Sequence, residues 1–68
     1  MQNLSKKLGW RIKKERILQN ISQEGLALMT DIDRSYVGRI ERGEVNITLE
    51  KLYEIASALK CSPKDLLP

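Results

Sequence analysis

The side chains best suited to chemistry in this chain are two arginines and a serine within six consecutive residues. Arg34 and Ser35 are adjacent, and Arg39 follows about one helical turn later, so a helix here would hold all three near one another. A guanidinium can donate to O6 and N7 of guanine together, and a hydroxyl can bond a base edge. These residues therefore predict base contacts with DNA. The alternative for Arg34 is a solvated ion pair with Asp31 or Asp33.

Four further polar residues could contact DNA phosphates. Asn46 and Thr48 precede a predicted helix and could hold a phosphate together with its free N–H groups, although Thr48 also suits the N-cap of that helix. Arg42 could contact the DNA backbone, or balance the dipole at the end of its own helix. Tyr36 could offer its hydroxyl to a phosphate, with packing in the core as the alternative. These residues predict phosphate contacts that flank the base-reading side chains.

The composition excludes most catalytic and metal sites. The 68 residues include one cysteine, Cys61, and no histidine, which excludes His–Cys zinc sites and histidine-dependent triads. The carboxylates show no spacing that sets up an acid–base pair, so we expect no enzyme, no cofactor and no small-molecule ligand. The net charge of +3 is compatible with a polyanionic partner.

Length and hydropathy favour a single soluble domain. Hydrophobic residues make up 41% of the sequence, which is enough for folding, but a domain this small buries only ~60% of the surface of its unfolded chain. A second copy would therefore add stability. No apolar run approaches the ~18 residues of a membrane helix, and the N-terminus lacks a signal-peptide pattern. We expect a cytoplasmic protein with no membrane partner.

Helical periodicity recurs along the chain, and no segment alternates as a strand would. We therefore predict an all-α fold, one domain over residues 1–68, with five helices at about 4–19, 23–29, 34–42, 49–59 and 63–67. Ser22, Asp33 and Thr48 are the expected N-caps. Asp31 must accept a positive φ in the tight turn between the second and third helices, and Gly43 must do so after the third.

The predicted core follows from apolar residues three and four positions apart. The first helix presents Leu4, Leu8 and Ile12 on one stripe. The fourth helix presents a wider stripe, made of Leu49, Leu52, Ile55, Ala56 and Leu59. Trp10 lies off the first stripe, and we interpret it as packing over the outside of the core, with contact to another protein as the alternative.

Short motifs spread over nearly the whole chain share the pattern of one family. They are KKER at 13–16, SQE at 22–24, LA at 26–27, IERG at 40–43, LEKL at 49–52 and IASAL at 55–59. Together they resemble the phage-repressor and Cro-like helix-turn-helix family, often called XRE. RSYV at 34–37 and NITL at 46–49 look most like the controller proteins of restriction–modification systems. Asp31 and Lys60 depart from the family, which usually has glycine there, and Val45 replaces an often basic residue.

This resemblance implies a compact, five-helix, lambda-repressor-like domain with its helix-turn-helix at residues 23–42. It implies that Gln23 grips a phosphate with its amide and backbone N–H. It also implies an ion pair between Arg16 and Glu41 that ties the first helix to the third. A homodimer is implied as well, with its interface at the C-terminal end, formed by Tyr53, Cys61, Leu66 and Leu67.

The function implied is a homodimeric regulator that binds double-stranded DNA at a pseudo-palindromic operator and controls its own transcription. Occupancy of the operator would block RNA polymerase or recruit it. A phage-type repressor is the near alternative to a controller protein. A different class, a protein-interaction module such as an antitoxin-like or anti-repressor domain, is favoured by Trp10 and by the modest net charge.

Overall fold

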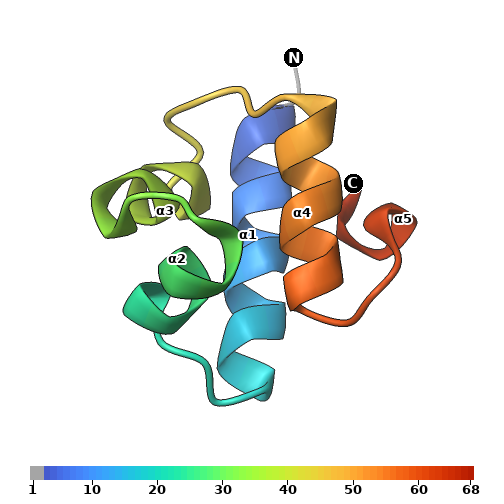
Figure 1. Ribbon diagram of the computed structural model, residues 1–68. Coiled ribbons are helices and arrows are strands. Elements are labelled where there is room, and N and C mark those ends of the chain that lie inside the picture. The colour runs from blue at the N-terminus through green and yellow to red at the C-terminus, as the bar shows by residue number, and fades with distance from the viewer. Residues whose placement is uncertain (1–2) are drawn as a thin grey trace.

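The computed structural model describes residues 3–68, and these residues form helices and no strands. The helices are α1 (Leu4–Leu18), α2 (Gln23–Thr30), α3 (Arg34–Glu41), α4 (Leu49–Ala58) and α5 (Pro63–Leu66). The predicted all-α architecture is therefore confirmed, and the helix ends fall close to the predicted ones. Figure 1 shows α2 and α3 on one side of the long α1, with α5 on the other. No helix in the described part of the chain is long and apolar enough to span a membrane.

The helix starts follow local side-chain chemistry, with one exception. The Ser22 hydroxyl accepts a hydrogen bond from the N–H of Gly25 at 2.9 Å, and the Thr48 hydroxyl accepts one from the N–H of Lys51 at 3.1 Å. Both residues are N-caps, as predicted. Asp33 occupies the N-cap position of α3 with an extended backbone, but its side chain makes no capping hydrogen bond. The predicted N-cap position of Asp33 is therefore confirmed, although its side chain does not bond the first turn of α3.

Each of the four longer helices is followed by a residue with left-handed backbone. Three of these residues are not glycine: Asn20 has φ 58°, Asp31 has φ 57° and Lys60 has φ 56°. Gly43, after α3, has φ 75°. The positive φ expected of Asp31 is present, so an aspartate makes the tight turn of the helix-turn-helix where glycine is usual. Asparagine and aspartate tolerate this region better than most residues.

The core lies where α1, α2, α3 and α4 meet, closed from the far side by α5. Its members are below one-tenth exposed, and seven of them are below 2% exposed. Burying each large apolar side chain contributes roughly 1.5–3 kcal/mol. The core residues are Ile12, Leu26, Ala27, Ile32, Val37, Ile40, Leu52, Ile55, Ala56, Leu59 and Leu66.

Three apolar residues predicted to be packed are exposed instead. Leu4 and Leu49, the first residues of α1 and α4, are 61% and 71% exposed. Both residues belong to the predicted apolar stripes of their helices. They lie in the first turn of each helix, however, and are not part of the core cluster. Trp10 is 58% exposed, and the ammonium of Lys14 lies 4.9 Å from the centre of its ring. Trp10 thus does not pack over the core.

Helices α1 and α3 approach each other through their backbones at Gly9. A Cβ atom at Gly9 would lie 2.3 Å from the carbonyl oxygen of Ile40 and 2.7 Å from that of Glu41. Real Cβ atoms essentially never make contacts this short, so residue 9 must be glycine for this crossing to form. The crossing brings the middle of α1 against the last turn of α3 and fixes the direction of α3.

Candidate nucleic-acid interface

Helix α3 exposes the three residues predicted to contact bases. Val37 and Ile40 are 1% and 2% exposed and anchor the inner face of the helix. Arg34, Ser35 and Arg39 are all exposed. The helix is therefore held from beneath, and its outer surface carries two guanidinium groups and a hydroxyl, as the spacing predicted. A surface of this kind can donate hydrogen bonds to base edges in a major groove.

Helix α3 is tied to α1 by a buried ion pair. The Arg16 Nε lies 2.6 Å from the Glu41 Oε2, and the Arg16 Nη2 lies 3.0 Å from the Oε1. The two side chains are 10% and 2% exposed. The remaining Nη1 of Arg16 donates to the carbonyl of Ile21 at 2.8 Å. This is the pair expected from the resemblance. It is bidentate, which adds geometric precision to the attachment of α3.

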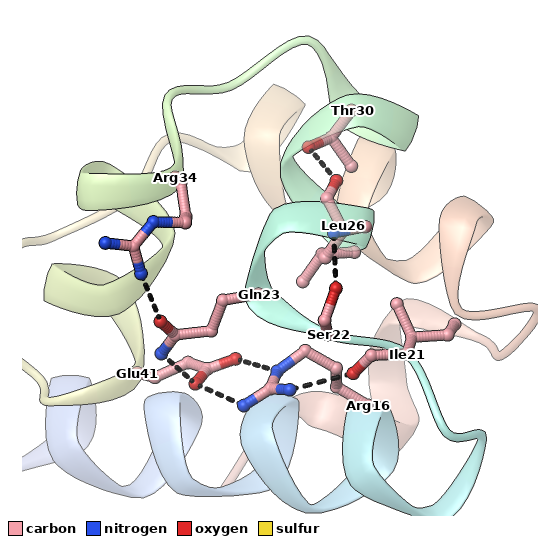
Figure 2. Close-up of polar contacts among 9 residues, drawn as sticks. Arg16, Ile21, Ser22, Gln23, Leu26, Thr30, Arg34 and Glu41 are labelled. Carbon is pink, nitrogen blue, oxygen red and sulfur yellow. Dashed lines mark hydrogen bonds and ion pairs between the residues drawn. The ribbon is translucent and has the colours of Figure 1, made fainter.

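Gln23, the first residue of α2, uses its side-chain amide within the protein. Its Nε2 donates to the Glu41 Oε1 at 3.0 Å, and its Oε1 accepts from the Arg34 Nη1 at 3.4 Å. Figure 2 shows the amide between the buried carboxylate and the exposed guanidinium. The amide that we expected to hold a phosphate is thus bonded at both ends.

Two cations near the end of α3 share one carboxylate that the sequence reasoning missed. The Arg42 Nε lies 2.7 Å from the Glu44 Oε2, and the Arg39 Nε lies 3.8 Å from the Glu44 Oε1. The hydrogen bond from Arg42 lowers the pKa of the Glu44 carboxyl, and the same bond raises the pKa of Arg42. The only sequence signal was an acidic residue two positions after Arg42. A phosphate that binds Arg42 must therefore compete with Glu44.

The segment between α3 and α4 holds the other residues expected at phosphates. The Asn46 Oδ1 accepts a hydrogen bond from the Ser5 hydroxyl of α1. The NH₂ group of the Asn46 amide therefore points away from Ser5. Thr48 caps α4 and so marks the position of the helix N-terminus. Tyr36 is half-buried against the core cluster, which agrees with the packing alternative.

The residues expected at a dimer interface divide between surface and core. Tyr53 is 58% exposed and Leu67 is 47% exposed, so both can meet a partner. Cys61 is half-buried, and this burial raises the pKa of its thiol. Leu66 is 1% exposed and belongs to the core of the single chain. Its placement at the dimer surface was therefore wrong. The C-terminal α5 lies on the opposite side of the molecule from α3 (Figure 1).

Residues 3–68 contain no group of three or more histidine, cysteine or carboxylate side chains that could hold a metal ion. Every buried side-chain nitrogen or oxygen in this part of the chain has a hydrogen-bond partner. The polar groups that remain available are thus at the surface, and those of α3, of the N-terminus of α2 and of the segment before α4 form the candidate interface.

The chain was compared with known families and proteins. The sequence model of the helix-turn-helix family matches residues 12–66. Control protein C.BamHI of Bacillus amyloliquefaciens is 39% identical over 66 residues, which cover 96% of this chain and 82% of that protein.

Two solved structures are also similar. The restriction–modification controller protein C.AhdI from Aeromonas hydrophila superposes with a TM-score of 0.89 at 40% identity, covering 91% of this chain and 94% of that one. The hypothetical transcription factor NHTF from Neisseria gives a TM-score of 0.90 at 34% identity, covering 96% and 75%.

Proposed function

This chain belongs to the helix-turn-helix family of DNA-binding transcription regulators, and we propose that it acts as a homodimeric controller protein on its own operon. The observation that carries the proposal is the outer surface of α3, where Arg34, Ser35 and Arg39 stand exposed on a helix fixed from below. The similarity to proteins named control or controller proteins supports the controller version over a phage repressor.

In the proposed mechanism, contacts to phosphates come first and set the register on DNA. The backbone N–H groups at the N-terminus of α2 bind one phosphate, and Asn46 with the N-terminus of α4 binds another. Helix α3 then lies in the major groove, where Arg34, Ser35 and Arg39 read base edges. Two such helices in a homodimer read half-sites ~34–36 Å apart, one turn of DNA. Occupancy then blocks RNA polymerase or recruits it.

A mobility-shift titration with the DNA upstream of the gene tests this function. A protein that neutralises 6–10 phosphates should lose about 10³–10⁵ in affinity between about 50 and 200 mM salt. The absence of any shift at low salt would contradict DNA binding. It would favour a protein-interaction module built around the exposed Trp10.

Arg34→Ala should relax base preference at one position of each half-site. A bidentate arginine contributes ~1–3 kcal/mol of discrimination at guanine, and Arg34 is exposed, so its loss should leave the fold intact. The measurement is a competition titration against half-sites changed one base pair at a time, with circular dichroism to check folding. An equal loss of affinity on every sequence would mean that Arg34 contacts only phosphate.

Leu67→Glu should weaken the homodimer before it unfolds the single chain. Leu67 is 47% exposed, so a carboxylate there stays in water in the monomer but would be desolvated in an interface. Sedimentation velocity over a concentration series measures the shift toward monomer. Leu28→Glu is the matched control, because Leu28 is 82% exposed on α2 and is not among the residues proposed for the interface. An unchanged dimer for Leu67→Glu would exclude Leu67 from the interface.

A further inference from the structure

We propose that the outer face of α1 binds an acidic segment of a partner protein, one that carries apolar side chains among its carboxylates. None of the residues of this face is among those proposed to contact DNA, so the face adds a second binding surface to the protein. The residues that form the outer face of α1 are Trp10, Arg11, Lys13, Lys14, Ile17 and Leu18, all of them exposed.

The positive charge of the chain is concentrated on α1. Residues 4–18 contain six lysines or arginines and one glutamate, whereas the rest of the chain contains six lysines or arginines and eight carboxylates. Without α1 the chain would therefore carry a net negative charge. Even the helix-turn-helix at 23–42 has three arginines against four carboxylates. The electrostatic attraction of this protein for an anionic partner thus comes chiefly from one helix.

The cations of the outer face have no carboxylate beside them. At the end of α3, two arginines share the carboxylate of Glu44. Within residues 3–68, by contrast, Arg11, Lys13 and Lys14 form no ion pair. A carboxylate from another molecule can therefore approach these three side chains without displacing an internal partner.

Apolar side chains lie among these cations. Trp10 is 58% exposed, Ile17 54% and Leu18 70%, and the ammonium of Lys14 lies 4.9 Å from the centre of the Trp10 ring. Trp10 lines two grooves. One, of about 270 Å³, is lined also by Lys13, Lys14, Ile17 and Leu18, and the other, of about 450 Å³, runs toward the start of α1. Both grooves combine apolar surface with cations, so each fits an apolar side chain that has a carboxylate next to it.

This mixture favours an acidic protein segment over other anionic partners. DNA phosphates would bind the cations but would leave the apolar side chains without contacts. A second copy of the chain would bring cations against cations, which is unfavourable. A helix that lies on a membrane separates its apolar face from its charged face, whereas at 3.6 residues per turn Lys14 stands between Trp10 and Leu18. A protein segment can place carboxylates and apolar side chains at matching intervals.

The fluorescence of Trp10 can test this proposal, because Trp10 is the only tryptophan in the chain. The probe is a synthetic helical peptide that carries glutamates and leucines at three- and four-residue spacings. Adding it to the wild-type protein should shift the emission of Trp10 to shorter wavelength as the ring leaves water. Two control peptides, one with every glutamate replaced by glutamine and one with every leucine replaced by serine, should each bind at least about fivefold more weakly.

Variants of the protein assign the binding to this face, with the anisotropy of a labelled peptide as the readout. Trp10→Ala should weaken binding at least about tenfold, as truncation of a central aromatic residue commonly does, and Lys14→Glu about fivefold. Lys51→Glu is the matched control. It makes the same change in net charge, on α4, and Lys51 lines neither groove, so binding should stay within about twofold of wild type. Circular dichroism checks that each variant is folded.

Several results would overturn the proposal. They are the absence of binding by the acidic peptide, equal binding by the peptide without leucines, and equal weakening by Lys14→Glu and Lys51→Glu. A larger shift of Trp10 emission with unrelated duplex DNA or with phosphatidylglycerol vesicles would assign the face to that partner instead. Operator binding by Trp10→Ala should match that of wild type. If wild type binds no DNA, the proposed function fails, and the peptide titration still decides what the outer face of α1 binds.

Discussion

Replacing Gly9 with alanine should leave this chain largely unfolded at room temperature. The added Cβ atom would meet the carbonyl oxygens of Ile40 and Glu41 at 2.3 and 2.7 Å. These atoms belong to the backbone of α3, so no side-chain rotation can relieve the overlap. Overpacking typically costs about 1–3 kcal/mol and occasionally more, and a clash between two helix backbones falls at the upper end. A domain of this size has roughly 3–5 kcal/mol to lose.

Urea unfolding followed by circular dichroism measures this effect, and Gly38→Ala is its matched control. Gly38 also lies inside a helix, but a Cβ atom there would meet the Nη1 of Arg42 at 3.2 Å, the movable end of an exposed side chain. The gain in helix propensity is worth up to ~1 kcal/mol, so Gly38→Ala should keep or raise stability. Wild-type stability for Gly9→Ala would contradict the close crossing of α1 and α3.

Arg16→Met should cost about 3–5 kcal/mol of unfolding free energy, because it leaves the Glu41 carboxylate buried without its countercharge. Glu41 is 2% exposed, and the neutral amide of Gln23 would be its remaining partner. The carbonyl of Ile21 would also lose the donor that Arg16 supplies at 2.8 Å. The free energy of unfolding, from urea titration at neutral pH, should therefore fall to near zero.

Two further variants make this result specific to the buried pair. Arg42→Met removes an arginine that pairs with the exposed Glu44, and it should not change stability measurably because surface pairs contribute little. The double variant Arg16→Met with Glu41→Leu removes both charges and should recover most of the loss. If Arg16→Met proves no more costly than Arg42→Met, the ion pair does not hold α3 in place.

The helices and most of their ends could be predicted because local chemistry determines them. Ser22 and Thr48 cap their helices through hydrogen bonds within one turn, and periodic apolar residues identify the buried faces. The left-handed backbone of Asp31 was also predictable. The turn between α2 and α3 is tight, and one of its residues must take a positive φ for the chain to change direction. All of these features depend on neighbours within a few positions in the sequence.

The features that the sequence did not reveal depend on how helices that are distant in the sequence pack against one another. The exposure of Leu4 and Leu49, and the burial of Leu66, depend on how far the neighbouring helices extend. The requirement for Gly9 comes from a residue thirty or so positions away. The Arg16–Glu41 pair was expected only from resemblance, since no local rule joins residues so distant.

The base-contact candidates were found from residue type and spacing, and the structure places them together on α3. The contacts of Gln23 with Glu41 and Arg34 were not predicted. A glutamine at the start of a helix gives no indication of which residues from other helices lie next to it. Glu44 was missed for a related reason. Glu44 matters because it pairs with Arg39 and Arg42 of the preceding turn. The sequence alone does not show the directions of these two side chains.

The ion pairs of Glu44 bear on how the protein searches a chromosome. Arg42 and Arg39 already have a carboxylate beside them in the free chain, so at the phosphate contact proposed for Arg42, binding would exchange one anion for another. This exchange weakens the sequence-independent attraction that holds such proteins on arbitrary DNA. We therefore expect short residence on unrelated sequence and quick release to the next segment, so that Glu44 contributes to the speed with which an operator is found.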